Sequence, residues 1–364
     1  MTDLGLHGLS CPYEPLDDEL LDVLGAEYSR QHLRIFVERA AETLDTAGEG
    51  LSAAVEAGAD GEVGFDVLWD ASISELSPPT LAGSAAERVR RAAGVALRLT
   101  ECGVARSWSA HLVEPAPLRL GRWTLADATD VEVGSNGSTW MHARLASGTK
   151  VRAVDAVDGW EVCGAIERPA VVMRRFSATL LAEDRLATSA ELRRAVELLR
   201  DHAPEYLGWI DRVIRHVAPI PARPGTMRSA SFPGRAGVVE MSFGCSVGAI
   251  AEMLVHEASH QHFHLASRLD DVDDGSDRTL YYSPLKDTGR PIDAILLAYH
   301  AFGNVLLLYR RCLEAGADPD GYFERNISPT SRQLAQLDDA LRTTTALTDV
   351  GTSLCRPLSE RLVR

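Results

Sequence analysis

The chain has 364 residues, 45% of them hydrophobic and 24% charged, which is typical of a globular protein with one large or two ordinary domains. Its 37 basic and 52 acidic residues give a net charge of −15, which argues against a nucleic-acid partner and favours solubility. The six cysteines are scattered without a C-x-x-C pair. We therefore expect reduced thiols in a cytoplasmic protein and no cysteine-rich metal site.

The first 20 residues are acidic and lack the basic start and apolar segment of a signal peptide. No apolar run reaches the roughly 18 residues that a membrane span requires. We therefore expect no membrane partner.

Residues 1–175 are expected to form an N-terminal region that is helical at first and then β-rich. Apolar residues at helical spacing predict a helix over 17–45, and Ser84 is a candidate N-cap for a second helix over 84–103. The intervening segment 52–64 is rich in small and acidic residues and is expected to be a loop.

From about 129 to 176, short β-rich runs separated by glycines predict a small antiparallel sheet. Its expected strands are 129–133, 139–145, 150–154 and 160–167. We expect this N-terminal region to guide or bind a peptide or its leader rather than to perform catalysis.

Residues 176–364 are expected to form the catalytic region, and the whole chain is predicted to have an α+β fold that is mainly helical. The expected elements are helices at 188–201, 204–217, 249–264, 292–311 and 330–347 and a strand at 238–243. That strand is expected to lie next to helix 249–264, where an edge strand can hold an extended peptide by main-chain pairing.

An H-E-x-x-H motif, His256-Glu257-Ala258-Ser259-His260, lies within the predicted helix 249–264. Residues four apart share one face of a helix, so both imidazoles can bind one metal ion with Glu257 beside them. The alternative is a helix that carries two stacked surface histidines.

Catalytic zinc and non-haem iron sites usually take three protein ligands, so a third is needed. His264 lies about 12 Å along the helix from His256, and His262 points to the opposite side. His300, in an apolar helix, is the better candidate, and the alternative is a core histidine with a backbone partner. Asn304 and Arg311 share its helical face, which suits a helix that lines a metal cavity.

A zinc metallopeptidase is the usual interpretation of this motif, with Glu257 as the general base for zinc-bound water. The usual third ligands are absent, because the longer H-E-x-x-H-x-x-G-x-x-H motif would need glycine at position 263 and histidine at position 266, and these are Phe263 and Ala266. No glutamate lies between Glu257 and Glu314 either.

Four motifs in order resemble a known family. They are His256–Gln261, Tyr281–Pro284, Arg290–Ile292 and Leu296–Phe302. Over about 225–312 the chain resembles the HExxH-type, 2-oxoglutarate-dependent peptide β-hydroxylases, which accompany the biosynthesis of ribosomally made, modified peptides in bacteria. The resemblance implies iron(II) rather than zinc, 2-oxoglutarate as cosubstrate, and hydroxylation of a side-chain β-carbon in a precursor peptide.

The distal carboxylate of 2-oxoglutarate needs a cation, and arginine is the natural bidentate partner. The candidates are Arg290, Arg311 and Lys286, and the side chains that could add hydrogen bonds are Asn304, Tyr281 and Ser283. Metal ligation by His256, His260 and His300 would depart from the usual two-histidine, one-carboxylate iron site. The role of Glu257 therefore stays open. A zinc peptidase and a non-enzymatic peptide-binding protein with a degenerate site remain the alternatives.

Overall fold

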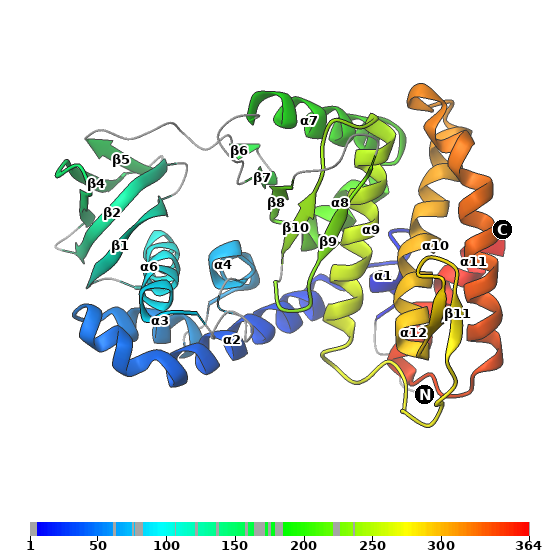
Figure 1. The fold of residues 1–364 in the computed structure, drawn as a ribbon, viewed down its shortest axis with the longest axis horizontal. Coiled ribbons are helices and arrows are strands. Elements are labelled where there is room, and N and C mark those ends of the chain that lie inside the picture. The colour runs from blue at the N-terminus through cyan, green and yellow to red at the C-terminus, as the bar shows by residue number, and fades with distance from the viewer. Residues whose placement is uncertain are drawn as a thin grey trace. The chain divides into compact units, whose positions relative to one another are not determined.

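The computed structural model describes residues 6–60, 63–74, 76, 83–105, 107–120, 123–135, 138–156, 159–163, 172–173, 176–178, 185–220, 226–235 and 237–363. It is mainly helical with small antiparallel sheets, so the predicted α+β class is confirmed at this level (Figure 1). The chain divides into two compact units. Unit 1 comprises Met1–Leu24, Ala178–Pro233 and Val238–Arg364, and unit 2 comprises Gly25–Ser177 and Gly234–Gly237. The structure thus groups the first 24 residues with the second half of the chain.

The helices of the N-terminal half are α2 (Asp18–Ala47), α3 (Leu51–Asp60), α4 (Phe65–Leu68), α5 (Ala71–Ser74) and α6 (Ala85–Glu101). Helices α2 and α6 lie where the sequence predicts them. Ser84 caps α6 in a reciprocal arrangement: its hydroxyl accepts from the Glu87 N–H, and the Glu87 carboxylate accepts from the Ser84 N–H. This capping box satisfies N–H groups that a helix start leaves unpaired.

The loop predicted at 52–64 is wrong, because most of it forms α3. Small residues here allow close packing. A side chain at Gly58 would meet Leu99 of α6 at 2.8 Å and Leu33 of α2 at 3.1 Å. The small residues therefore mark a tight helix–helix contact within unit 2.

Unit 2 also contains the predicted antiparallel sheet, which has five strands in sequential order. They are β1 (Trp108–Leu120), β2 (Trp123–Ser135), β3 (Thr139–Leu145), β4 (Lys150–Ala156) and β5 (Gly159–Cys163). β1 was not predicted. It contains Pro115 and Pro117, and register shifts between His111 and Leu118 accommodate these prolines. The predicted strand 160–167 ends at Cys163, and residues 164–171 lie outside the described residues. Two short strands, β6 (Val172–Met173) and β7 (Phe176–Ala178), pair antiparallel with each other.

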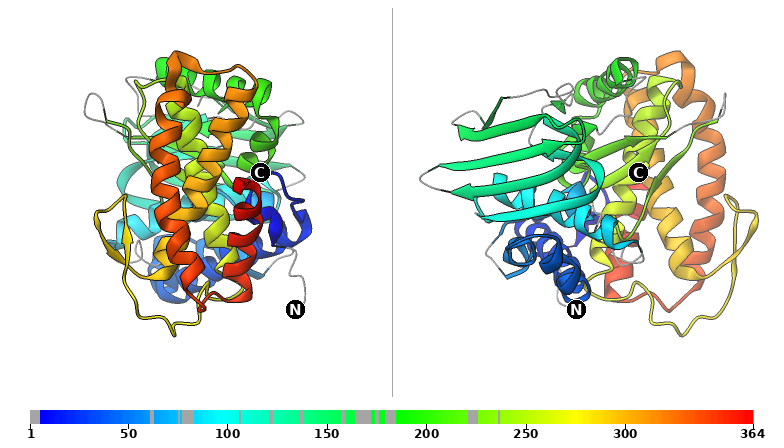
Figure 2. Two further views of the ribbon diagram at one scale, coloured as in Figure 1. Left: turned by 90° about the vertical axis from the view of Figure 1, so that its right-hand side faces the viewer. Right: turned by 60° about the vertical axis from the view of Figure 1, so that its left-hand side comes forward.

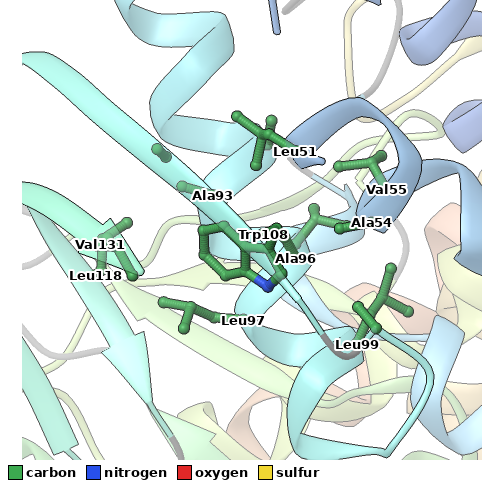
Figure 3. Close-up of a cluster of buried hydrophobic side chains, with 14 of the residues drawn as sticks. Leu51, Ala54, Val55, Ala93, Ala96, Leu97, Leu99, Trp108, Leu118 and Val131 are labelled. Carbon is green, nitrogen blue, oxygen red and sulfur yellow. The ribbon is translucent and has the colours of Figure 1, made fainter. Parts of the chain in front are cut away.

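The inner face of this sheet packs on α3 and α6 to form the core of unit 2 (Figure 3). Trp108 lies among the labelled side chains of this cluster, and its indole N–H donates to Thr100 Oγ1 at 3.0 Å. Thr100 in turn donates to the Ala96 carbonyl at 2.8 Å. The one polar atom of the indole is thus satisfied inside an apolar core.

Thr100→Val should therefore destabilise the chain by about 1–3 kcal/mol, because it leaves the buried indole N–H unpaired. The same substitution in a Trp108→Phe background should cost clearly less, since no N–H remains to be satisfied. Urea unfolding followed by far-UV circular dichroism measures both costs. Equal costs in the two backgrounds would show that the hydrogen bond contributes nothing.

Unit 1 is built from helices around one central helix, α9. Its helices are α1 (His7–Ser10), α7 (Arg185–His202), α8 (Pro204–Val213), α9 (Val247–Ala266), α10 (Ile292–Glu314), α11 (Tyr322–Thr343) and α12 (Asp349–Val363), with a 3₁₀ turn at Pro319–Gly321. Helices α7, α8 and α10 all contact α9, and α10 also contacts α11 and α12. The left view of Figure 2 shows α9, α10 and α11 side by side.

Several bounds differ from the prediction. The helix expected at 204–217 ends at Val213, and β8 (His216–Pro219) follows it. The helix expected at 330–347 is α11, which begins eight residues earlier. Helix α12 and the hairpin of β11 (Tyr281–Ser283) and β12 (Thr288–Arg290) were not predicted.

Two further strands of unit 1 lie beside α9. β10 (Val238–Met241) is the predicted strand 238–243 and pairs with β8 in parallel and with β9 (Ser229–Ser231) antiparallel. It contacts α9 through Gln261, whose amide donates to the Val238 carbonyl at 3.5 Å. β9 is the last strand of its sheet. The edge strand beside α9 is therefore β9, and β10 lies inside the sheet.

By length and composition alone, helix α10 could cross a membrane, whereas the sequence predicted no apolar run of that length. Of its most apolar window, 78% is buried inside the structure. A helix at the core of a globular unit is also apolar on most sides. This observation leaves the cytoplasmic localisation a prediction.

Candidate metal centre

Helix α9 carries the H-E-x-x-H motif, and the residue before it, Ser246, is its N-cap, whose hydroxyl accepts from the Ala249 N–H. From Gly248 to Ala266 it is buried except for four half-buried side chains, Glu252, His256, His260 and His264. These are spaced four residues apart, which is about 40° of rotation per step. They therefore form a single polar line along an otherwise buried helix.

His256 and His260 face each other on this line. Their Nε2 atoms are 3.0 Å apart, and their rings are nearly perpendicular. Two imidazole nitrogens that share an ion at about 2.1 Å lie about 3.0–3.4 Å apart, in octahedral or tetrahedral geometry. The observed separation therefore fits one shared ion. It also fits a hydrogen bond from one protonated Nε2 to the other ring.

Both imidazoles are neutral at physiological pH. Burial lowers the pKa of His256 to about 4, and the charge of Lys286 lowers it further. Burial also lowers the pKa of His260 well below its ordinary value, with the neighbouring His256 as the next cause. Nδ1 of His260 is buried without a hydrogen-bond partner among the described residues. Neutral imidazole is the form that binds metal ions.

Glu257 is turned toward strand β9. Its carboxylate accepts from the Ser231 hydroxyl at 2.6 Å. Burial raises the pKa of Glu257, and hydrogen bonds from Ser229 and Ser231 oppose that shift. The carboxylate is thus held by the edge strand rather than by another charged group.

His300, the predicted third ligand, is fully buried on α10, and its Nε2 lies 3.0 Å from the Leu9 carbonyl oxygen. A carbonyl oxygen only accepts, so this Nε2 carries the proton and donates. Burial lowers the pKa of His300 to about 4. Its Nδ1 has no partner among the described residues and is the nitrogen left with a lone pair.

Asn304 and Arg311 also have partners away from the histidine pair. The Asn304 amide donates to the Ser10 and His300 carbonyls, each at 2.9 Å. Arg311 forms an ion pair with Glu205 of α8 at 3.2 Å. The polar face of α10 is therefore directed at α1 and α8, and the structure does not bring these two side chains to His256 and His260.

The β11–β12 hairpin brings other predicted residues together. Tyr281 pairs with Arg290 and Ser283 with Thr288, so these four side chains share one face. On this face Ser283 is fully buried, Tyr281 and Arg290 are half-buried and Thr288 is exposed, whereas Tyr282 on the other face is 54% exposed. The hairpin packs on α10 and α11.

Polar groups of this hairpin differ in their partners. The Tyr281 hydroxyl donates to Asp277 at 2.6 Å. The hydroxyl of Ser283 has no hydrogen-bond partner in the described part of the chain. Lys286, exposed in the turn, is the charge that helps to lower the pKa of His256. Ser283 thus offers a hydrogen-bond donor on this hairpin, and Lys286 offers a cation whose charge reaches His256.

Glu252, one turn before His256, was not predicted as a site residue. It accepts hydrogen bonds from the hydroxyls of Tyr309 and Tyr322. Burial raises its pKa, and the two tyrosines oppose that shift. In the sequence, its position four residues before His256 placed it on the same face of the helix and could have indicated that it belongs to the site.

Among the described residues, no group of three or more His, Cys, Asp or Glu side chains is arranged to hold a metal ion. The histidine pair is thus the centre of the candidate site, and its third ligand stays a prediction. No family model matches this chain, and no curated protein matches it significantly.

The buried histidines predict how stability depends on pH. Burial lowers the pKa of His262 from 6.5 to about 3. Below pH 6.5 the unfolded chain binds a proton that the folded chain excludes, so stability falls as pH falls through this window. His262→Gln keeps a donor for the Trp209 carbonyl, to which Nε2 of His262 now donates. This substitution should reduce the slope of the free energy of unfolding against pH by up to about 1.4 kcal/mol per pH unit.

Urea unfolding of the metal-free chain between pH 7.5 and 5 measures this slope. His202→Gln, at a half-buried position at the C-terminal end of α7, is the matched control, because it leaves His262 in place and should keep the slope that His262 sets. An unchanged slope in His262→Gln would contradict the assignment.

Proposed function

We propose that the chain is an iron(II)- and 2-oxoglutarate-dependent oxygenase that hydroxylates a side-chain β-carbon of a ribosomally made precursor peptide. The observation that carries the proposal is the pair of neutral imidazoles, His256 and His260, with Nε2 atoms 3.0 Å apart. The hairpin with the unpaired Ser283 hydroxyl and the Lys286 charge supports a second, anionic ligand beside them.

The residues present fit an iron(II) ion in part. His256 and His260 would provide two nitrogens, and Nδ1 of His300 is the proposed third ligand. When bound, iron supplies the oxidation of a peptide C–H bond by oxygen, coupled to the oxidation of 2-oxoglutarate to succinate and carbon dioxide. Glu257, held by Ser231, is proposed to position the motif rather than to act as a base.

The protein's own groups would bind and shield the cosubstrate. Lys286 is proposed to pair with the distal carboxylate, with Ser283 as a hydrogen-bond donor and Arg290 on the same hairpin. Phe302 of α10 packs edge-to-face on His256 with ring centres 5.0 Å apart. This contact fixes the ring and keeps water from one side of it.

Alanine at His256, His260 or His300 should each remove most of the bound iron, because one lost ligand forfeits several kcal/mol of a metal-binding energy on the order of ten. The measurement is metal content after anaerobic purification and reconstitution. His264→Ala, on the same helical line, is the control and should keep its iron.

A second variant must accompany His300→Ala, because alanine also removes the hydrogen-bond donor to the Leu9 carbonyl. His300→Gln supplies an amide donor without an imidazole nitrogen. Full iron content in a folded His300→Gln variant would place the third ligand elsewhere and leave the histidine pair standing.

Lys286→Met should raise the KM for 2-oxoglutarate about ten- to a hundredfold while iron content stays unchanged, because a charge-assisted hydrogen bond contributes roughly 1.5–3 kcal/mol. Arg290→Met on the same hairpin is the matched comparison. The readout is succinate release with iron(II), ascorbate, oxygen and a precursor peptide. A raised KM in Arg290→Met alone would move the anchor to Arg290.

A zinc peptidase is the second candidate, and the antiparallel edge strand β9 beside Glu257 favours it, because such a strand can hold an extended peptide. Glu257→Gln should abolish a peptidase, which needs its base, and should reduce an oxygenase only modestly. A peptide that gains one oxygen atom, with succinate release, supports the oxygenase. Cut peptide under zinc, without any need for 2-oxoglutarate, would replace it with the peptidase.

A further inference from the structure

The outer face of the unit 2 sheet bears a charged hollow that the proposed reaction does not use. Its volume is about 680 Å³, and it lies over strands β1 to β4 and the end of α2. The register places two rows of polar side chains across it. One row is His111, Asp130, Arg144, Lys150, and the other is Ser109, Glu132, His142, Arg152. The right view of Figure 2 shows the strands of this sheet side by side.

The two halves of the hollow differ in charge. On β1 and β2, the Asp130 carboxylate lies 2.8 Å from Nδ1 of His111, and Arg144 of β3 forms an ion pair with it at 3.7 Å. On β4, Lys150 and Arg152 are exposed and have no ion pair with any carboxylate whose side chain the structure describes. In a chain of net charge −15, two such cations in one hollow form a local attraction for anions.

The spacing of these cations matches an extended chain. Lys150 and Arg152 are two residues apart on one strand, so they point to the same side about 6.6–6.8 Å apart. Alternate side chains of an extended peptide have the same period. Trp140, half-buried over Gly134, continues this face beyond His142, and their rings are 4.7 Å apart. The tryptophan adds an apolar surface at one end of the charged row.

We propose that this hollow of unit 2 is a docking site for an acidic, extended peptide segment whose alternate carboxylates pair with Lys150 and Arg152. The match to the strand period favours a peptide over a single small dicarboxylate. The carboxylates of Asp130 and Glu132 in the same hollow disfavour a polyphosphate such as nucleic acid. The docking is independent of the reaction proposed for unit 1, and it goes beyond it.

The test uses the full chain without metal and a fluorescein-labelled peptide of alternating glutamate and threonine, followed by fluorescence anisotropy at low salt. The Lys150→Glu, Arg152→Glu double variant should bind at least about tenfold more weakly, because two attractions become repulsions. Glu132→Gln should bind more tightly, since it removes a like charge. The Arg39→Glu, Arg193→Glu double variant, at exposed positions on α2 and α7 outside the hollow, controls for the same change in net charge.

Two further peptides test the spacing and the charge. A peptide with the same composition but its glutamates in one block should bind more weakly, and one with glutamine in place of glutamate should not bind. Unchanged binding in the double variant, or equal binding of the alternating and block peptides, would overturn the proposal. Displacement of the peptide by micromolar glutarate would replace it with a site for small dicarboxylates.

Discussion

Helix α9 is buried on nearly every side, and this burial governs the polar groups around it. An unpaired polar group costs roughly 1–3 kcal/mol in such a place, so each polar side chain of α9 needs a partner from a neighbouring element. Glu257 has Ser231, His262 has the Trp209 carbonyl, and Gln261 has the Val238 carbonyl. Among the described residues, the Nε2 atoms of His256 and His260 have only each other as hydrogen-bond partners. The proposed metal ion would bind at these two nitrogens.

Polar side chains of α10 donate hydrogen bonds to the carbonyl groups of helix α1. The last carbonyls of a helix have no partner within it, and α1 is a single turn buried among α9, α10 and α12. Trp209 donates to Gly8, His300 to Leu9 and Asn304 to Ser10. Polar residues that suggested a metal cavity thus cap a short helix from the far end of the sequence.

The local features were predictable from the sequence, and the long-range ones were not. The capping box at Ser84 and Glu87 and the turn-separated strands β2 to β4 depend on neighbours within a few residues. By contrast, the partner of His300 lies 291 residues away, at Leu9. Helix α3 was missed because small residues are common to loops and to tight helix contacts, and only the closeness of Leu99 to Gly58 distinguishes them.

Prolines account for other errors. Pro357 lies inside α12 and Pro329 inside α11, where a missing N–H and a clash with the preceding turn usually end a helix. Leu354 and Leu358 of α12 are fully buried, and Leu358 lies against Gly303 of α10. Packing of this kind offsets the lost hydrogen bond. It cannot be predicted from neighbouring residues, because the packing partners are far apart in the sequence.

In both candidate reactions the role of Glu257 depends on the edge strand β9. A general base must present its carboxylate to metal-bound water, whereas here the Ser231 hydroxyl donates to it at 2.6 Å from an edge strand. If a peptide paired with β9, it would add its main chain beside that serine. Any movement of Ser231 would change the hold on Glu257, which is adjacent in sequence to His256. The contact between an edge strand and a motif carboxylate would therefore couple peptide pairing on β9 to the geometry of the histidine pair under either proposed reaction.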